Sequence, residues 1–183
     1  MRKLVVAAAL AGAMSFGAFT VSAAEQGAGY APPDIALQKE KLAALAIIEG
    51  EWSGEGWTYG ADGKKRAFTQ TEEVAFMLDG AILTVHGTGR SKDAAPDTKP
   101  AFEAFAIISW DEKESAYRFR SYANGHYGEF PLTVLEEGGF QWSTPGGIRY
   151  EAAVKDGIWT EKGFRARPDG GSVQFFEMTV KRR

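Results

Sequence analysis

The chain has 183 residues, of which 44% are hydrophobic, 13% aromatic and 25% charged, and it contains no cysteine. This composition is typical of one globular domain and excludes disordered, collagen-like and disulfide-linked proteins. The formal charge is −3, and without residues 1–24, which carry Arg2 and Lys3 but no acid, 19 basic side chains face 24 acidic ones, a balance of −5. Because nucleic-acid binding needs clustered cations, we expect no nucleic-acid partner.

Residues 1–24 have the pattern of a secretory signal peptide: a basic start, an apolar stretch and small residues at positions 21–24. An uncleaved membrane anchor is the alternative. No other segment approaches the ~18 consecutive apolar residues that cross a bilayer. We therefore expect no membrane span after cleavage and a mature protein that is periplasmic or secreted. Residues 25–34, rich in Gly and Pro, indicate a flexible leader before the domain at 35–183.

A short helix is predicted at residues 35–48. The carboxylate of Asp34 can accept hydrogen bonds from the unpaired N–H groups of a first helical turn. Leu42, Leu45 and Ile48 repeat at helical spacing, and Gly50 ends the run.

After Gly50 the chain becomes rich in aromatic and β-branched residues, separated by turn signals. Dipeptides such as Asp62-Gly63 and Asn124-Gly125 tolerate the positive φ of tight hairpins. Nine such connections without a helix predict a meander of ten antiparallel strands. Closing the meander removes its exposed edges, so we expect an all-β, antiparallel up-and-down barrel of the calycin-like type; a two-sheet sandwich is the alternative. The predicted strands cover residues 51–59, 64–78, 80–89, 101–110, 115–123, 126–136, 139–144, 147–154, 158–167 and 172–181.

Alternation within these strands places aromatic and charged residues on shared faces. Residues 68–78 are an example, with Phe, Gln, Glu and Val on one face; in residues 117–120 the two kinds are instead separated, since Tyr117 and Phe119 oppose Arg118 and Arg120. A barrel lumen can be partly polar and wet, whereas a solid core cannot bury unpaired charges. The mixed faces therefore favour a barrel with a cavity.

The run Gly50–Gly56 (GEWSGEG) resembles the start of lipocalin-like barrels, in which the Trp closes one end and the glycines let the strand bend. Together with Leu78–Gly80, Tyr117–Arg120 and Phe176–Met178, it is similar to an exported bacterial family catalogued as domain of unknown function 1579, over residues 42–182. The resemblance implies a barrel fold and no particular chemistry. The structural motif that it implies consists of Gly50, Trp52, Gly54 and Gly56.

The same run resembles that of nitrobindins, which are ten-stranded haem-binding barrels. Their pattern continues with a glycine and Tyr-Pro, where this chain has Thr58, Gly60 and Ala61, and their haem-ligating histidine near the C-terminus has no counterpart in residues 173–183. Met178 could ligate iron in principle, but a strand Met more often packs in a core. We expect no cofactor, and a haem-binding, nitrobindin-like enzyme is the less favoured alternative.

Catalytic and metal-binding patterns are weak. Zinc or iron sites need two or three His with carboxylates, and the chain has only His86 and His126. We expect no metal site, with His86 as a hydrogen-bonded wall residue and His126 as a solvated rim residue. There is no Gly-x-Ser-x-Gly elbow. The adjacent Glu72 and Glu73 point to opposite faces, so solvated strand faces account for them better than joint acid–base catalysis. No catalytic residue is predicted.

A cluster of aromatic and cationic residues is the candidate ligand site. Guanidinium groups suit bidentate capture of a carboxylate or phosphate, and aromatic rings could supply an apolar wall. Alternatively, the arginines face water and pair with Glu151 or Glu161, for under ~1 kcal/mol each. Residue spacing alone does not determine which of the two faces of most strands points into the barrel. The candidate ligand-binding residues are Tyr117, Arg118, Arg120, Trp142, Arg149, Tyr150 and Glu161.

Together these patterns favour an exported barrel that binds a small, partly apolar ligand, hydrophobic or anionic. One alternative is an envelope interaction or structural module whose barrel is filled by side chains. The other is the haem enzyme considered above.

Overall fold

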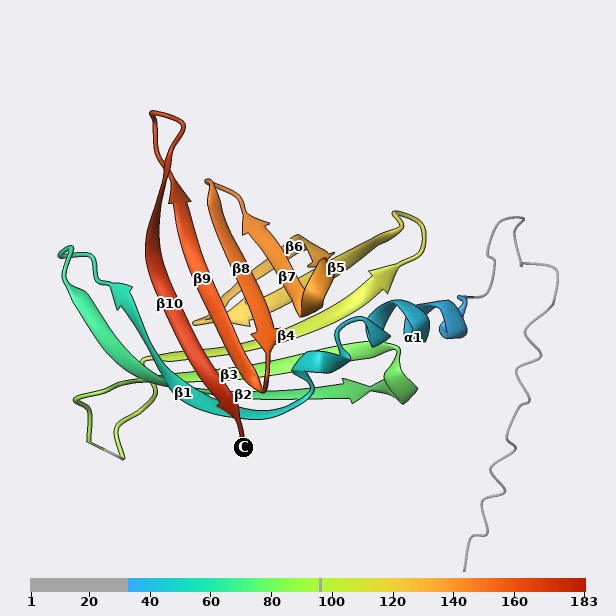
Figure 1. Cartoon of the computed structure of the whole chain (residues 1–183), viewed down its shortest axis with the longest axis horizontal. Coiled ribbons are helices and arrows are strands. Elements are labelled where there is room, and N and C mark those ends of the chain that lie inside the picture. The colour runs from blue at the N-terminus through green and yellow to red at the C-terminus, as the bar shows by residue number, and fades with distance from the viewer. Residues whose placement is uncertain (1–32, 96) are drawn as a thin grey trace, which may run out of the picture. The chain divides into compact units, whose positions relative to one another are not determined.

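The computed structural model describes residues 33–95 and 97–183. In this part of the chain, ten antiparallel strands pair with their chain neighbours, and the first strand pairs with the last, so the sheet closes into a barrel (Figure 1). The predicted ten-stranded up-and-down barrel is confirmed, and the sandwich alternative is excluded. The strands are β1 (Gly50–Tyr59), β2 (Lys65–Met77), β3 (Ile82–Ser91), β4 (Phe102–Asp111), β5 (Ala116–Ala123), β6 (His126–Leu135), β7 (Gly139–Thr144), β8 (Ile148–Lys155), β9 (Ile158–Ala166) and β10 (Ser172–Arg182).

The predicted single helix is in fact two elements. Helix α1 spans Ile35–Ala43, and a 3₁₀ turn, η2, spans Ala46–Ile48. Asp34 caps α1 as predicted, because its carboxylate accepts a hydrogen bond of 3.0 Å from the backbone N–H of Leu37.

The change of winding after α1 has a packing reason. The N–H of Leu45 donates to the carbonyl of Leu42, and the N–H of Ile48 donates to the carbonyl of Leu45. This spacing of three residues is that of a 3₁₀ helix, in which side chains at i and i+3 are eclipsed. All three side chains are buried against the barrel, so the tighter winding keeps them on one face.

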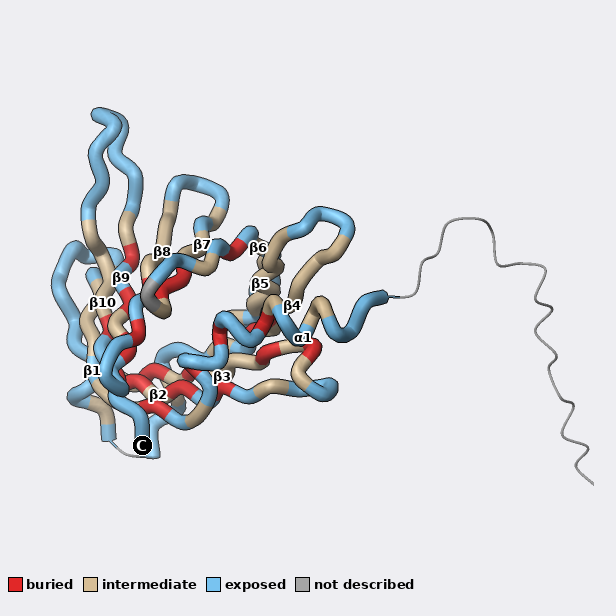
Figure 2. The backbone as a smooth tube through the Cα atoms, turned by 45° about the vertical axis from the view of Figure 1, so that its right-hand side comes forward, coloured by how far each residue is buried: buried red, intermediate tan, exposed pale blue. Residues whose placement is uncertain are grey.

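One end of the barrel is closed by Trp52. Its side chain is fully buried, and its indole Nε1 donates a hydrogen bond of 2.8 Å to the carbonyl oxygen of Ile48. The ring of Trp159 packs edge-on against it with centroids 5.8 Å apart. Figure 2 shows the buried segments in the half of the barrel nearest α1, and exposed hairpins beyond the other half. The Trp plug implied by the lipocalin-like motif is present.

Two glycines of that motif allow β1 to approach β10 closely. A Cβ at Gly54 would lie 2.1 Å from the carbonyl oxygen of Thr179, and a Cβ at Gly56 would lie 2.4 Å from that of Glu177. No side chain fits at either position, so both glycines are required by backbone packing.

The second predicted strand ends one residue early. Leu78 does not continue β2 but opens a 3₁₀ turn, η3 (Leu78–Gly80), in which Leu78 and Asp79 have φ of 52° and 56°. The side chain of Leu78 is exposed.

The predicted signal peptide and almost all of the predicted leader lie outside the described residues. Among the described helices, none is long and apolar enough to cross a membrane.

Candidate ligand-binding site

Strand register decides which side chains face the inside of the barrel. The buried Trp52 lies opposite Glu72 on β2 and opposite Arg182 on β10. Because side chains alternate along each strand, following the pairs around the closed sheet from Trp52 assigns one face of every strand to the lumen.

The lumen has a packed half and an open half. In the packed half, Leu83, Ile108 and Val180 are almost fully buried around Trp52. In the open half, inward-facing aromatic side chains remain partly exposed, which means that water-sized molecules reach them. These side chains are Phe68, Phe119, Phe130, Trp142, Tyr150 and Phe176.

Stacked rings form the wall of the open half. Trp142 and Tyr150 stack with centroids 4.9 Å apart and planes inclined by 12°. Phe68 and Phe176 stack at 5.7 Å, and Tyr150 meets Phe176 edge-on at 6.0 Å. Gly163 lies between them, where a Cβ would contact Tyr150 at 3.0 Å and Phe176 at 3.1 Å. Aromatic rings therefore contact one another from Trp142 on β7 through Tyr150 and Phe176 to Phe68 on β2.

Buried polar side chains face the same lumen: Gln70, Glu72 and Glu161 are 4%, 7% and 8% exposed. The amide of Gln70 donates a hydrogen bond of 2.7 Å to the carboxyl of Glu72. Burial raises the pKa of Glu72 to about 7, against the opposing effects of the Gln70 hydrogen bond and the His86 charge. The expectation that Glu72 lies on a solvated face is wrong, because its register position opposite Trp52 turns it inward.

Glu161 is the more isolated acid. Burial, and then the charge of Glu72, raise the pKa of Glu161 well above the usual range of a glutamate. Burial and the charge of Glu161 in turn raise the pKa of Tyr150 to about 12. Glu72 is thus close enough to affect the protonation of Glu161, and Glu161 that of Tyr150. These three side chains and Gln70 form the polar floor of the open half.

Glycines on β3 make room for this floor. A Cβ at Gly87 would lie 2.7 Å from a carboxyl oxygen of Glu72, and a Cβ at Gly89 would lie 2.9 Å from the amide oxygen of Gln70. The two polar side chains therefore lie flat against the backbone of β3.

The structure brings together only part of the predicted ligand site. Trp142, Tyr150 and Glu161 lie together in the open half of the lumen. Tyr117 also faces inward, but its hydroxyl donates a hydrogen bond of 2.7 Å to the carbonyl of Lys41, so it anchors α1 at the closed end.

The three predicted arginines lie on the outer face and do not join this group. Arg118 lies 3.6 Å from Asp111, and Arg120 lies 3.1 Å from Glu129. Arg149 pairs with Glu151. The alternative assignment, arginines on the outer face with acidic partners, is the one observed: Arg118 and Arg120 pair across strands, whereas Arg149 pairs with Glu151 on its own strand, and Glu161 is not one of the partners.

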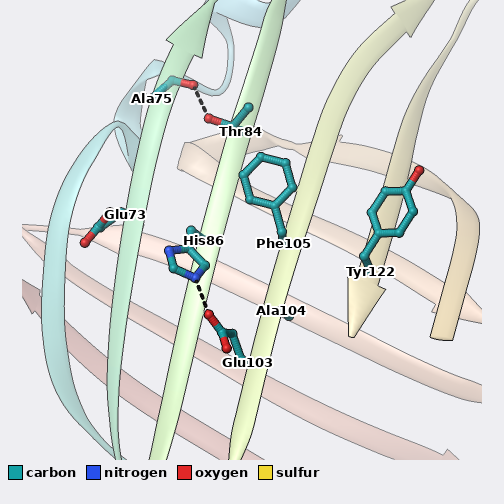
Figure 3. Close-up of a pocket in the computed structure, with 8 residues that line it drawn as sticks. All are labelled: Glu73, Ala75, Thr84, His86, Glu103, Ala104, Phe105 and Tyr122. Carbon is teal, nitrogen blue, oxygen red and sulfur yellow. Dashed lines mark hydrogen bonds and ion pairs between the residues drawn. The ribbon is translucent and has the colours of Figure 1, made fainter. Parts of the chain in front are cut away.

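Both histidines lie outside the polar floor. His86 is hydrogen-bonded as predicted, to Glu103 at 3.1 Å, but on the outer wall. It lines a shallow groove of about 430 Å³ on the outer face of β2 to β5 (Figure 3). His126 is exposed at the start of β6. Within the described residues, no group of three or more His, Cys, Asp or Glu side chains could hold a metal ion.

The outer groove is a less convincing ligand site than the lumen. Figure 3 shows the rings of Phe105 and Tyr122 side by side on the sheet surface, with the carboxylates of Glu73 and Glu103 beside His86. These side chains are largely exposed, so a bound molecule would remain in water on one side.

Sequence reasoning missed Gln70, Glu72, Phe68 and Phe176 as site residues. One signal was available in the printed sequence: Phe, Gln and Glu at alternate positions of residues 68–72 share a face with Val74 and Phe76. A face that is otherwise apolar indicates burial, and polar residues on it indicate a functional lumen.

The structure defines the class of fold: a closed, up-and-down antiparallel barrel of ten strands, with Trp52 buried at one end. Among solved structures, the chain is similar to Rv2717c from M. tuberculosis, with a TM-score of 0.57 and 11% identity, over 78% of this chain and 96% of that one. It is also similar to the S-type phycobiliprotein lyase CPES from Guillardia theta, with a TM-score of 0.51 and 9% identity, over 83% and 98% of the two chains. At these identities the likeness shows the fold alone. No family model and no curated protein matches the chain, so membership of the family of domain of unknown function 1579 stays a prediction.

Proposed function

We propose that the protein is a binding protein that holds a small, partly apolar molecule in the open half of its barrel. The observation that carries this proposal is the contrast between the two halves of the lumen. Around Trp52 the interior is packed, whereas around Trp142 and Tyr150 inward-facing rings are still reached by solvent. A barrel selected only for stability has no need to leave such rings accessible.

The apolar wall can supply moderate affinity. A ligand that loses ~200 Å² of apolar surface to the wall gains about 5 kcal/mol. This corresponds to a submillimolar Kd before the costs of association. Tighter binding therefore requires a polar contact, for which the floor offers the carboxyl groups of Glu72 and Glu161. The outward-facing Arg118, Arg120 and Arg149 give no support to the anionic ligand considered from the sequence.

A neutral fluorescent probe tests the proposal. We expect N-phenylnaphthylamine to bind with enhanced emission. Ser121 faces the open half of the lumen, and Ser143 lies on the outer face. The variant Ser121→Trp should fill the lumen and weaken probe binding at least tenfold, whereas Ser143→Trp, the same substitution on the outside, should leave it unchanged.

The mass of the purified protein provides a second test. A mass excess in native spectra that disappears on denaturation would identify a natural ligand. If the probe does not bind the wild-type protein and the native mass equals that of the polypeptide, the barrel is filled and the structural-module alternative is the better account.

We propose further that the protein acts in the periplasm or outside the cell. The support is the basic, apolar and small-residue pattern of residues 1–24. Sequencing the N-terminus of the protein isolated from its native cells tests this. A start within a residue or two of position 24 is expected, and a start at Met1 would contradict the proposal.

A further inference from the structure

We infer that the ligand of this barrel carries a cationic head group, an ammonium on an apolar body, that is bound by Glu161 and Glu72. The inference rests on the proposed function, and it names the ligand class for the same site.

The first observation is that Glu161 has no hydrogen-bond or ion-pair partner among the described residues. It is more than nine-tenths buried and faces the lumen, opposite Met178 on β10 and Ala152 on β8. In the part of the chain that the structure describes, its carboxyl oxygens make no hydrogen bond or ion pair to a side chain or backbone group. The fully enclosed side-chain atoms without a partner are Arg118 Nε and Trp159 Nε1. The oxygens of Glu161 are not among them, so they still open onto the lumen.

The second observation is that Glu72 is held as an acceptor. The amide of Gln70 donates to one of its oxygens, and the backbone of β3 at Gly87 lies directly beneath the carboxyl group. Charged carboxyl groups offer acceptors only. A lumen floor with two carboxyl groups therefore matches a ligand that donates several hydrogen bonds from one atom, as an ammonium does.

The aromatic wall of the open half also favours a cationic head group. An ammonium attracts the faces of aromatic rings, most strongly that of an indole. Tyr150, which stacks on Trp142, lies close enough to Glu161 for the charge of the acid to raise the tyrosine pKa. A cation at the floor would thus meet carboxylate and ring together, whereas an anion would meet two acids.

Two cations share the lumen-facing register with the floor, Arg165 on β9 and Arg182 on β10, and among the described residues neither forms an ion pair with Glu72 or Glu161. The guanidinium of Arg182 lies 4.3 Å from the ring centroid of Trp52 and donates hydrogen bonds to the backbone carbonyls of Ile47 and Glu49. Arg165 is exposed at the open end of β9, with its guanidinium 5.2 Å from the ring centroid of Phe175. Its charge is screened by solvent, and it makes no ion pair with Glu161 among the described residues.

Binding of an ammonium ion removes protons from the floor. In the empty lumen, burial favours the neutral carboxyl of Glu161. When an ammonium enters, the O–H bond of that carboxyl breaks, its proton goes to solvent, and the carboxylate accepts an N–H from the ligand. Because the pKa of Glu72 is also raised, to about 7, both acids can lose a proton to solvent, and up to two protons are released for each ligand bound.

The experiment uses three ligands that share a naphthalene ring and differ in their polar head group. Naphthylmethylamine, naphthalenemethanol and naphthoic acid are titrated into the full-length mature protein by calorimetry at neutral pH. We expect the amine to bind at least tenfold more tightly than the alcohol, and the alcohol more tightly than the acid. Calorimetry in buffers of different ionisation enthalpy should show proton release for the amine alone.

Single substitutions of acids distinguish the effect of the floor carboxyl groups from that of the overall negative charge of the protein. Glu161→Gln and Glu72→Gln should each lower amine affinity about tenfold or more while the alcohol changes less than twofold. Glu73→Gln, on the outer face beside Glu72, should change neither. If the amine binds no better than the alcohol, or if replacing both Glu161 and Glu72 by Gln leaves proton release unchanged, the inference is overturned while the proposed function stands. If N-phenylnaphthylamine and all three ligands fail to bind, the proposed function itself is overturned.

Discussion

The carboxyl group of Glu72 lies against the α-carbon of Gly87 on the neighbouring strand. A Cβ at position 87 would come within 2.7 Å of one carboxyl oxygen and 2.9 Å of the other. The glycine therefore leaves the space in which Glu72 accepts the hydrogen bond from Gln70.

Replacement of Gly87 by Ala should displace Glu72 from this position. The buried carboxyl would lose its hydrogen bond to Gln70, and we expect the free energy of unfolding to fall by about 1–2 kcal/mol. Urea denaturation measures the loss. In a Glu72→Ala background the space is already free, so Gly87→Ala should then be nearly neutral. Additive losses in the double variant would contradict the contact.

The raised pKa of Glu72 predicts that stability falls as pH rises. The ordinary value is 4.5 and the folded value is about 7. Between these values the unfolded chain gives up its proton while the folded protein keeps it, so the free energy of unfolding decreases with pH and levels off above about pH 7. The decrease due to Glu72 is on the order of 3 kcal/mol. Urea denaturation at pH 5 and pH 8 measures it.

The control for this pH effect is the neutral isostere. Glu72→Gln should lose less stability than the wild-type protein between pH 5 and pH 8, while the exposed Glu73→Gln should lose as much as wild type. Glu161, whose pKa is raised in the same direction, adds its own decrease at higher pH. An equal loss in Glu72→Gln and wild type would show that Glu72 titrates normally.

Sequence patterns predicted the barrel because its turns and strands are determined by residues that are close together in the chain. Turn dipeptides such as Asn124-Gly125 adopt positive φ as expected, and the absence of intervening helices leaves only antiparallel pairing. A single sequence therefore contains enough information to find these features. The Trp plug, in contrast, was implied by the resemblance of the run around Trp52 to lipocalin-like barrels.

The lumen floor could not be predicted in the same way. Whether Glu72 or Glu73 faces inward depends on the register of β2 against β1, and a slip of one residue exchanges the two. Arg118 and Arg120 share a face at the expected spacing, but that face is the outer one. The role of Gly87, which is to leave space for the carboxyl group of Glu72, becomes apparent only when β3 is placed beside β2. The missing information is therefore long-range register.

The outward arginines should be dispensable for ligand binding. Arg118 and Arg120 pair with Asp111 and Glu129 on the partly solvated outer face, where such pairs contribute under ~1 kcal/mol. We expect Arg120→Gln to leave the Kd for N-phenylnaphthylamine within twofold and to lower stability only slightly. Trp142→Ala, which removes half of the stacked pair in the lumen, should weaken probe binding at least tenfold. The opposite order would place the ligand on the outer face.

The closed end should determine stability rather than binding. Trp52 is fully buried, donates to the carbonyl of Ile48 and packs against Trp159. In Trp52→Phe, a buried carbonyl loses its donor and a small cavity forms, so we expect a loss of about 2–4 kcal/mol. The same substitution at Trp57, on the outer face of β1, should lose less than about 1 kcal/mol. Probe affinity at low denaturant should be unchanged in both variants, because neither ring lines the open half. A large affinity loss in Trp52→Phe alone would show that the two halves of the lumen are coupled.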